Sequence, residues 1–110
     1  MSELKKPAAP LASATILLLR DGANGIEVFM VKRHHQIDFA SGALVFPGGK
    51  VDEHDRDPAL RALTDGVAGL NDLQLSVAAC AIREGFEESG ILLARKPGQR
   101  DYVDAASSSA

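Results

Sequence analysis

The chain has 110 residues, of which 45% are hydrophobic and 25% are charged, and its formal net charge is −3. This length provides one domain with a modest core and is too short for two. The composition excludes wholesale disorder, and the negative charge argues against general binding of nucleic acid or anionic membranes, which relies on clustered Lys and Arg. The single cysteine, Cys80, excludes an internal disulfide, and we expect it to be a small core residue.

Residues 1–12 are rich in Lys, Pro and Ala without periodicity, which predicts a flexible lead-in. The apolar run that follows, residues 14–19, ends at Arg20 and is too short to span a bilayer. It also lacks the longer apolar core and the cleavage pattern of a secretory signal. We therefore expect a cytoplasmic protein that does not associate with membranes.

Four apolar segments predict strands. Residues 14–20 and 26–33 form a hairpin in this interpretation, because the sequence DGANG between them offers turn residues that can take positive φ. The sequence ALVF at 43–46 predicts a short strand, and PGGK is expected to end it, because Pro47 has no N–H to donate to a ladder. The sequence ILLA at 91–94 predicts a further strand.

Two helices are expected between these strands. Asp57 followed by proline is a helix start, with the carboxylate as N-cap, and predicts a short helix over about 58–65. Ser76 is a candidate N-cap for a second helix that runs to about Ser89, with Gly90 as its C-terminal cap.

The second predicted helix carries a cluster of carboxylates in the sequence REGFEESG. Glu84, Glu87 and Glu88 stand in i, i+3, i+4 relation, so they share one helix face. Like charges at this spacing repel by a few tenths of a kcal/mol per exposed pair, and Arg83 offers the obvious local relief. Hard divalent cations prefer carboxylate oxygens, so the face is either a metal site or an ordinary solvated acidic face, the commoner case when such a cluster stands alone.

The sequence GGKVDEHD, taken with REGFEESGI, resembles the nudix box of the nudix hydrolases. That pattern is a glycine, five residues, a glutamate, seven residues, and then Arg-Glu-apolar-x-Glu-Glu-x-Gly-apolar. Matched by position, the resemblance places Gly49 at the first glycine, Arg83 at the arginine, Glu84, Glu87 and Glu88 at the metal-associated glutamates, and Gly90 and Ile91 at the close. It extends over residues 14–94.

Three positions depart from the nudix pattern. Asp55 stands where the family has glutamate, which keeps a supporting role with a shorter reach. Residues 56–82, which are 27 in number, stand where the pattern has seven, so we expect an insertion at about 56–75 that forms the first helix and a loop. Gly85 occupies an apolar position and indicates either close packing against another backbone or a tolerated weak point in the helix.

The insertion and the preceding sequence RHHQIDFASGALVFPGGKVD resemble one nudix branch, which includes peroxisomal coenzyme A diphosphatases. The resemblance implies the nudix fold, an α/β/α sandwich around a mixed sheet. The family continues after the box with further strands and a helix, whereas this sequence ends 20 residues after Gly90. We therefore expect only the N-terminal portion of that fold, over residues 13–94, with 95–110 as a tail or truncated remainder.

The same resemblance implies metal-dependent hydrolysis of a pyrophosphate bond in a nucleoside diphosphate derivative, with coenzyme A or acyl-coenzyme A as candidates. It assigns catalysis to Glu84, Glu87 and Arg83, where Arg83 orients the glutamates. It assigns Mg²⁺ or Mn²⁺ binding to Glu84, Glu87, Glu88 and the Gly49 carbonyl. One of the glutamates, or a residue of the remaining fold, would accept the proton of the attacking water.

Further residues have two open interpretations each. Arg33 and Gly48 are candidate substrate contacts, but Arg33, with the two histidines after it, is also typical of a solvated loop, and Gly48 of a plain turn. Asp52 and Asp55 either support the metal site from the loop or belong to a solvated acidic turn. Arg83 is either the orienting residue or half of an ordinary surface pair with Glu87.

Two other functions compete with the enzyme. One is a noncatalytic nudix-like module that binds nucleotide or a protein, and the other is an inactive truncated fragment. The complete set of glutamates favours the enzyme, since a binding module does not need it, and the short chain favours the alternatives. A homodimer that covers an exposed sheet edge is a further expectation.

Overall fold

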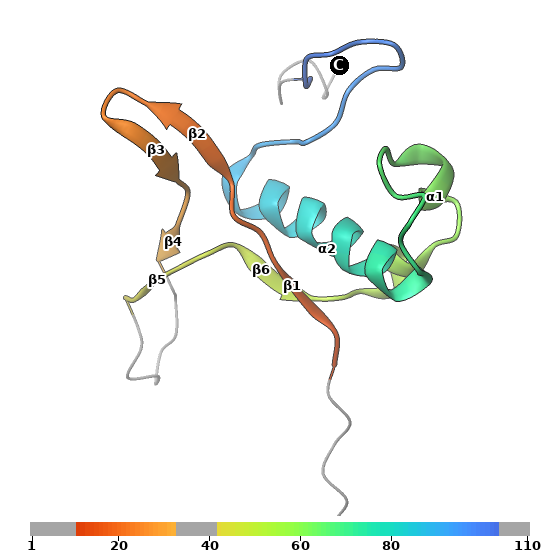
Figure 1. The fold of residues 1–110 in the computed structure, drawn as a ribbon. Helices are drawn as coiled ribbons and strands as arrows, with labels where there is room; N and C mark the ends of the chain where they lie inside the picture. Colours follow the sequence, from red (N-terminus) through yellow and green to blue (C-terminus); the bar gives the residue numbers. More distant parts are fainter. Residues whose placement is uncertain (1–10, 33–41, 104–110) are drawn as a thin grey trace, which may run out of the picture.

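A computed structural model describes residues 11–32 and 42–103 and has the α/β composition expected from the sequence (Figure 1). The strands are β1 (Ser13–Thr15), β2 (Leu19–Gly22), β3 (Gly25–Val28), β4 (Val31–Lys32), β5 (Leu44–Val45) and β6 (Gly48–Lys50). The helices are the 3₁₀ turn η1 (Glu53–Arg56), α1 (Leu60–Leu63) and α2 (Asp72–Ser89). Within the described ranges, the strands form three antiparallel pairs, β1 with β6, β2 with β3 and β4 with β5. No helix in these ranges is long and apolar enough to cross a membrane.

The predicted hairpin is confirmed at its turn but is shorter than expected. β2 and β3 pair from Leu19 with Val28 to Gly22 with Gly25. The single strand predicted over 14–20 is wrong, because the chain changes partner within it and β1 pairs with β6 instead. The Phe29 N–H donates to the Leu18 carbonyl at 2.9 Å, next to the hairpin.

The expectation that PGGK ends the strand at 43–46 is confirmed, because β5 stops at Val45, but the sequence analysis missed a separate strand that follows. Gly48 to Lys50 form β6, which pairs with β1 in the register Ser13 with Lys50 and Thr15 with Gly48. The Pro47 carbonyl accepts from the Ile16 N–H at 2.9 Å, so the proline continues the pairing without needing a donor of its own. The glycines are required here because a Cβ on Gly48 would collide with the backbone carbonyl of Ala14.

Helix α2 begins five residues earlier than predicted. Its N-cap is Asn71, whose side chain accepts from the Gln74 N–H at 2.8 Å, while the Gln74 side chain accepts from the Asn71 N–H. This reciprocal capping box fixes the start, and Ser76 lies inside the helix, where its hydroxyl donates to the Asp72 carbonyl. The predicted end is confirmed, because Gly90 caps the helix at φ +78°.

The inserted segment contains less helix than expected. α1 covers only Leu60–Leu63, and Asp57 precedes it, with its carboxylate accepting from the Ala59 N–H at 2.9 Å. The first turn of α2 lies inside the expected insertion at 56–75. The strand predicted at 91–94 is wrong, because this segment makes no ladder with the described strands; the Ala94 carbonyl accepts from the Val103 N–H instead.

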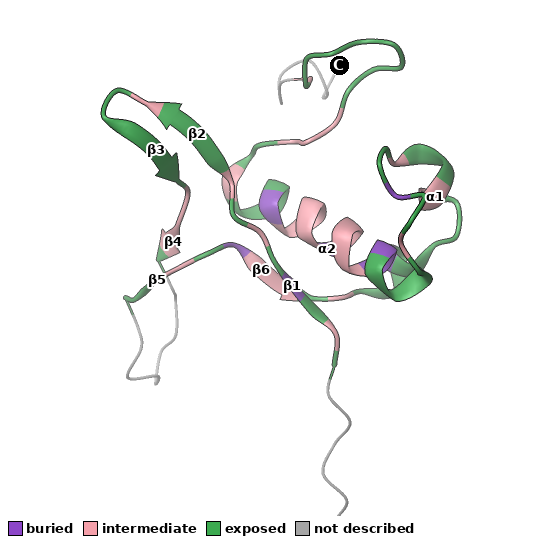
Figure 2. Cartoon of the chain, viewed as in Figure 1, coloured by how far each residue is buried: buried purple, intermediate pink, exposed green. Residues whose placement is uncertain are grey.

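The core lies where α2 packs against β1, β6 and η1 (Figures 1 and 2). Its most buried side chains are Pro47 and Cys80, which confirms the predicted position of the cysteine. Gly85 is also buried, and a Cβ there would lie 3.4 Å from Ile16 Cγ2 and 3.8 Å from Leu18 Cδ1. Close packing at Gly85 is therefore against side chains of the neighbouring strand segment rather than against its backbone.

Candidate functional site

The glutamates of α2 gather at the glycines of β6. The Gly48 N–H donates to Glu88 Oε1 at 3.0 Å, although the two residues are 40 positions apart in sequence. Glu84 lies over the next glycine, since a Cβ on Gly49 would be 2.7 Å from Glu84 Cδ. The absence of side chains on β6 therefore creates the space that these two carboxylates occupy, which a plain turn would not require.

Arg83 joins the glutamates to the start of the insertion. Its NH1 donates to Glu84 Oε2 at 3.2 Å and to both carboxylate oxygens of Glu87 at 3.3 Å. Its Nε and NH2 donate to the two oxygens of Asp55 at 3.0 and 2.9 Å. The pair with Glu87 that was expected on the surface is present, but it is one part of a four-residue ionic cluster.

Asp55 is the most buried member of this cluster, with 4% of its side chain exposed. The Asp52 N–H also donates to Asp55 Oδ2 at 2.8 Å, while the Asp52 carboxylate accepts from the His54 N–H and caps η1. Hydrogen bonds from Arg83, and then from the Asp52 backbone, hold the pKa of Asp55 below its ordinary value despite burial. The same contact with Asp55 raises the pKa of Arg83.

Asp52 lies farther from the glutamates. Its side chain is about half exposed and faces His54, with Oδ1 at 3.3 Å from His54 Nδ1. The hydrogen bond from the His54 backbone lowers the pKa of Asp52. The two acids that sequence treated alike therefore differ: Asp55 contacts Arg83, and Asp52 holds the turn that presents Asp55.

Cys80 fills the space beneath the cluster. Its thiol lies 3.5 Å from the Gly49 carbonyl and 3.4 Å from the Lys50 carbonyl, either of which can accept its proton. Burial, together with the nearby charge of Asp55, raises the pKa of Cys80, so the thiol is neutral near pH 7. Arg83 NH2 also donates to the Lys50 carbonyl at 3.3 Å, so helix and strand are fastened together at this point.

The residue types in this cluster fit a hard divalent cation. Glu84 and Glu88 offer carboxylate oxygens beside β6, and the Gly49 carbonyl lies on the helix side of that strand. Glu87, with 54% of its side chain exposed, lies at the edge of the cluster. Within residues 11–32 and 42–103, no group of three or more His, Cys, Asp or Glu side chains is arranged closely enough to hold a metal ion.

The structure brings together the selected residues that lie within its described ranges. Those assembled at the junction of α2, β6 and η1 are Gly48, Gly49, Asp52, Asp55, Arg83, Glu84, Glu87 and Glu88. Arg33, with His34 and His35, lies outside the described residues. Sequence analysis missed the contact between Asp55 and Arg83, because the spacing of Asp52 and Asp55 indicates only their local capping box and not a partner 28 positions away.

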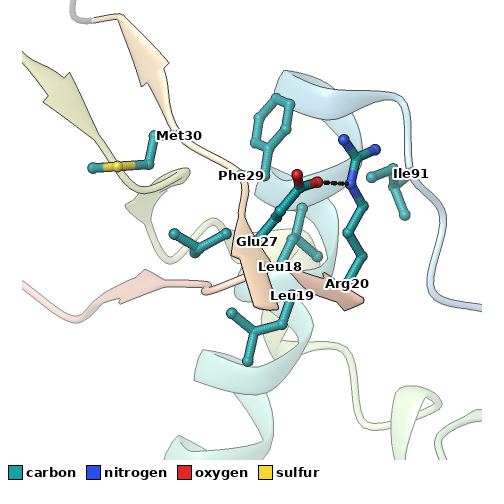
Figure 3. Close-up of a pocket in the computed structure, with 8 residues that line it drawn as sticks. Leu18, Leu19, Arg20, Glu27, Phe29, Met30 and Ile91 are labelled. Atoms are coloured by element: carbon teal, nitrogen blue, oxygen red, sulfur yellow. Dashed lines mark hydrogen bonds and ion pairs between the residues drawn. The ribbon is translucent and has the colours of Figure 1, made fainter. Parts of the chain in front are cut away.

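A separate pocket of about 670 Å³ lies on the hairpin (Figure 3). Phe29, Met30 and Ile91 line it, and Arg20 spans it to Glu27 with Nε at 2.7 Å from Oε1. None of the candidate site residues within the described ranges lines this pocket. Those described candidates lie at the α2, β6 and η1 junction.

Comparison with known proteins agrees with the resemblance seen in the sequence. The crystal structure of a NUDIX hydrolase from Alicyclobacillus acidocaldarius is 40% identical, with a TM-score of 0.66, over 84% of this chain and 42% of that one. The acyl-coenzyme A diphosphatase NUDT19 of Xenopus laevis is 28% identical over 67% of this chain and 27% of its own length. No family model matches the chain. The chain thus spans less than half the length of either relative.

Proposed function

We propose that this chain, which belongs to the nudix hydrolase family, carries the metal-binding part of an active site that hydrolyses pyrophosphate bonds in nucleoside diphosphate derivatives. The observation that supports this most directly is the convergence of Glu84 and Glu88 on the glycines of β6. The carboxylates of an ordinary solvated acidic face would point into water instead of lying against the backbone of β6. The ionic contact of Arg83 with Glu84 and Glu87 completes the arrangement.

In this proposal, Glu84, Glu87, Glu88 and the Gly49 carbonyl would hold Mg²⁺ or Mn²⁺. Such a cation neutralises phosphate charge and lowers the pKa of bound water. Arg83 positions Glu84 and Glu87, because its guanidinium is itself fixed by Asp55. Glu87 and Glu88 are both exposed, and Glu87, which Arg83 contacts, is our candidate for accepting a proton from the attacking water.

We further propose coenzyme A or an acyl-coenzyme A as substrate. The support is the acyl-coenzyme A diphosphatase activity of the Xenopus laevis relative, together with the insertion inside the box of this chain. Gly48 would contact substrate through the backbone of β6, and Arg33, which is outside the described residues, would contact a phosphate. The remaining part of a nudix fold, which the relatives possess, would supply the other substrate contacts.

The first test measures release of phosphate or nucleotide from coenzyme A, ADP-ribose and a nucleoside triphosphate with about 5 mM Mg²⁺. Glu87→Gln should lower kcat by about 100-fold or more if Glu87 accepts the proton, whereas exchange for the isosteric amide keeps the helix. Glu53→Gln is the matched control, because it removes one exposed charge from η1 outside the cluster and should leave turnover unchanged.

A folded chain without turnover on any of these substrates would contradict catalysis by this chain. Binding of Mn²⁺, followed by its paramagnetic resonance signal, then separates the alternatives. A nudix-like binding module or inactive fragment would show the same Mn²⁺ affinity in the chain and in Glu84→Gln. The proposed metal site predicts that Glu84→Gln weakens Mn²⁺ binding at least tenfold.

A further inference from the structure

The hairpin of β2 and β3 presents apolar side chains that the described elements leave largely uncovered. Leu19 lies opposite Val28 in the ladder, and Ile26 is two residues from Val28, so the three side chains share one face. Leu19 is 61% exposed, Ile26 is 74% exposed and Val28 is 39% exposed. Figure 2 shows both strands exposed over almost their whole length. These three residues form the hairpin face.

The backbone of β3 has hydrogen-bonding groups that β2 does not use. The Phe29 N–H donates to the Leu18 carbonyl, so these two residues form a hydrogen-bonded pair next to the ladder. In an antiparallel ladder such pairs alternate with pairs that exchange no hydrogen bonds, and Val28 and Ile26 belong to the second kind. Their N–H and C=O groups therefore point away from β2, toward an edge where no other described strand pairs with β3.

This edge of β3 can accept another strand. Its sequence, GIEV, contains neither the lysine nor the proline that commonly protect a sheet edge, and its one charged residue, Glu27, accepts from Arg20 at 2.7 Å. A strand that paired with β3 would gain main-chain hydrogen bonds at Ile26 and Val28. Its own apolar side chains would then lie beside the hairpin face.

A second copy of this chain fits the edge poorly. Two β3 strands that both used Ile26 and Val28 in an antiparallel pair would place Ile26 of one copy opposite Val28 of the other. Glu27 would then lie directly opposite Glu27 of the second copy, and like charges in that position are destabilising. The register therefore favours a different polypeptide over the homodimer expected from the sequence.

The solved relative indicates which polypeptide this is. The match with the Alicyclobacillus acidocaldarius NUDIX hydrolase covers 84% of this chain but only 42% of the relative. More than half of the relative therefore has no counterpart in residues 1–110. That unmatched part is long enough to supply a strand for β3 together with a layer over the hairpin face.

We propose that the free edge of β3 and the hairpin face bind a β-strand from the part of a nudix hydrolase that has no counterpart in this chain. The inference rests on the proposed function for the identity of this partner, and it names the surface through which the partner would complete the enzyme. Main-chain hydrogen bonds supply the affinity, and the apolar side chains fix the register. Ile26 is the central residue, because it combines outward backbone groups with the most exposed side chain of the hairpin face.

The test adds the unmatched segment of the Alicyclobacillus acidocaldarius relative to this chain as a separate polypeptide and measures complex formation by sedimentation. The two should form a one-to-one complex in which hydrogen exchange at the Ile26 and Val28 amides slows about tenfold or more. A fusion of the chain to the same segment should show equal protection of these amides, which covers a segment that does not fold alone.

Ile26→Lys should weaken the complex about tenfold or more, because the ammonium would have to lose its water beside an apolar strand. The variant should fold, since Asp21 lies opposite position 26 in the ladder and can pair with the introduced charge. Leu63→Lys is the matched control, because Leu63 is 79% exposed and belongs to α1, which Figure 1 places well away from the hairpin. It should keep the full affinity.

Unchanged exchange at Ile26 and Val28 in both the mixture and the fusion would overturn the inference, as would equal losses of affinity in the two lysine variants. A chain that sediments alone as a dimer with these amides protected would also overturn it, because the edge would then belong to a second copy. Failure of the proposed function is read separately, as a complex that protects both amides but releases no phosphate in the presence of metal.

Discussion

The hairpin and the helix junction of this chain use similar residues with different results. β2 and β3 expose almost every side chain, including Leu19 and Ile26, and their ion pair between Arg20 and Glu27 lies in solvent. At the junction of α2, β6 and η1, the ion pair of Asp55 with Arg83 is mostly buried. The difference indicates that the junction is packed by the described elements themselves, whereas the hairpin lacks a covering layer within the described residues.

The largest expected effect comes from breaking the buried ion pair. Asp55→Ala should lower the free energy of unfolding by about 3 kcal/mol. This value is at the lower end of the range for breaking a buried ion pair, because 28% of the Arg83 side chain is exposed. Glu27→Ala breaks the exposed pair and should cost between about 0 and 1 kcal/mol. Urea denaturation of both variants measures the two values, and equal losses would remove the distinction between the two regions.

A glycine substitution tests the close approach of β6 to its neighbours. Gly48→Ala should destabilise the chain by about 1–3 kcal/mol, because the new Cβ meets the Ala14 carbonyl, and backbone cannot move aside as a flexible side chain can. The control is Gly69→Ala in the insertion, where no atom lies within 4 Å of an added Cβ. Thermal unfolding should separate them, and a Gly48→Ala variant as stable as the control would contradict the described packing.

A smaller expected effect is the loss of stability at acidic pH. Because Arg83 lowers the pKa of Asp55 in the folded chain, the pair contributes its full stability above the ordinary carboxyl pKa of about 4 and loses it as the pH falls through the lowered value. The stability difference between the chain and Asp55→Asn should therefore shrink between about pH 5 and pH 3. Urea midpoints across this range measure it, and a constant difference would mean that Asp55 does not titrate with folding.

Sequence reasoning succeeded where the signal was local. The spacing of Glu84, Glu87 and Glu88 fixes their common face once a helix forms, and Gly90 ends that helix because only glycine readily takes its positive φ. It failed where a strand depends on which distant segment pairs with it. β1 separates from β2 because β6 pairs with it, and residues 91–94 form no strand without a described neighbour.

The sequence by itself determined which carboxylates share a helix face, because residue type and helical spacing are properties of a few neighbouring residues. Tertiary structure decided which of those groups meet. Asp55 reaches Arg83 across 28 positions only because η1 packs on α2, and Arg95 pairs with Asp65 only because the segment after α2 returns to the insertion. Such contacts depend on chain path and steric fit, which local residue patterns do not encode.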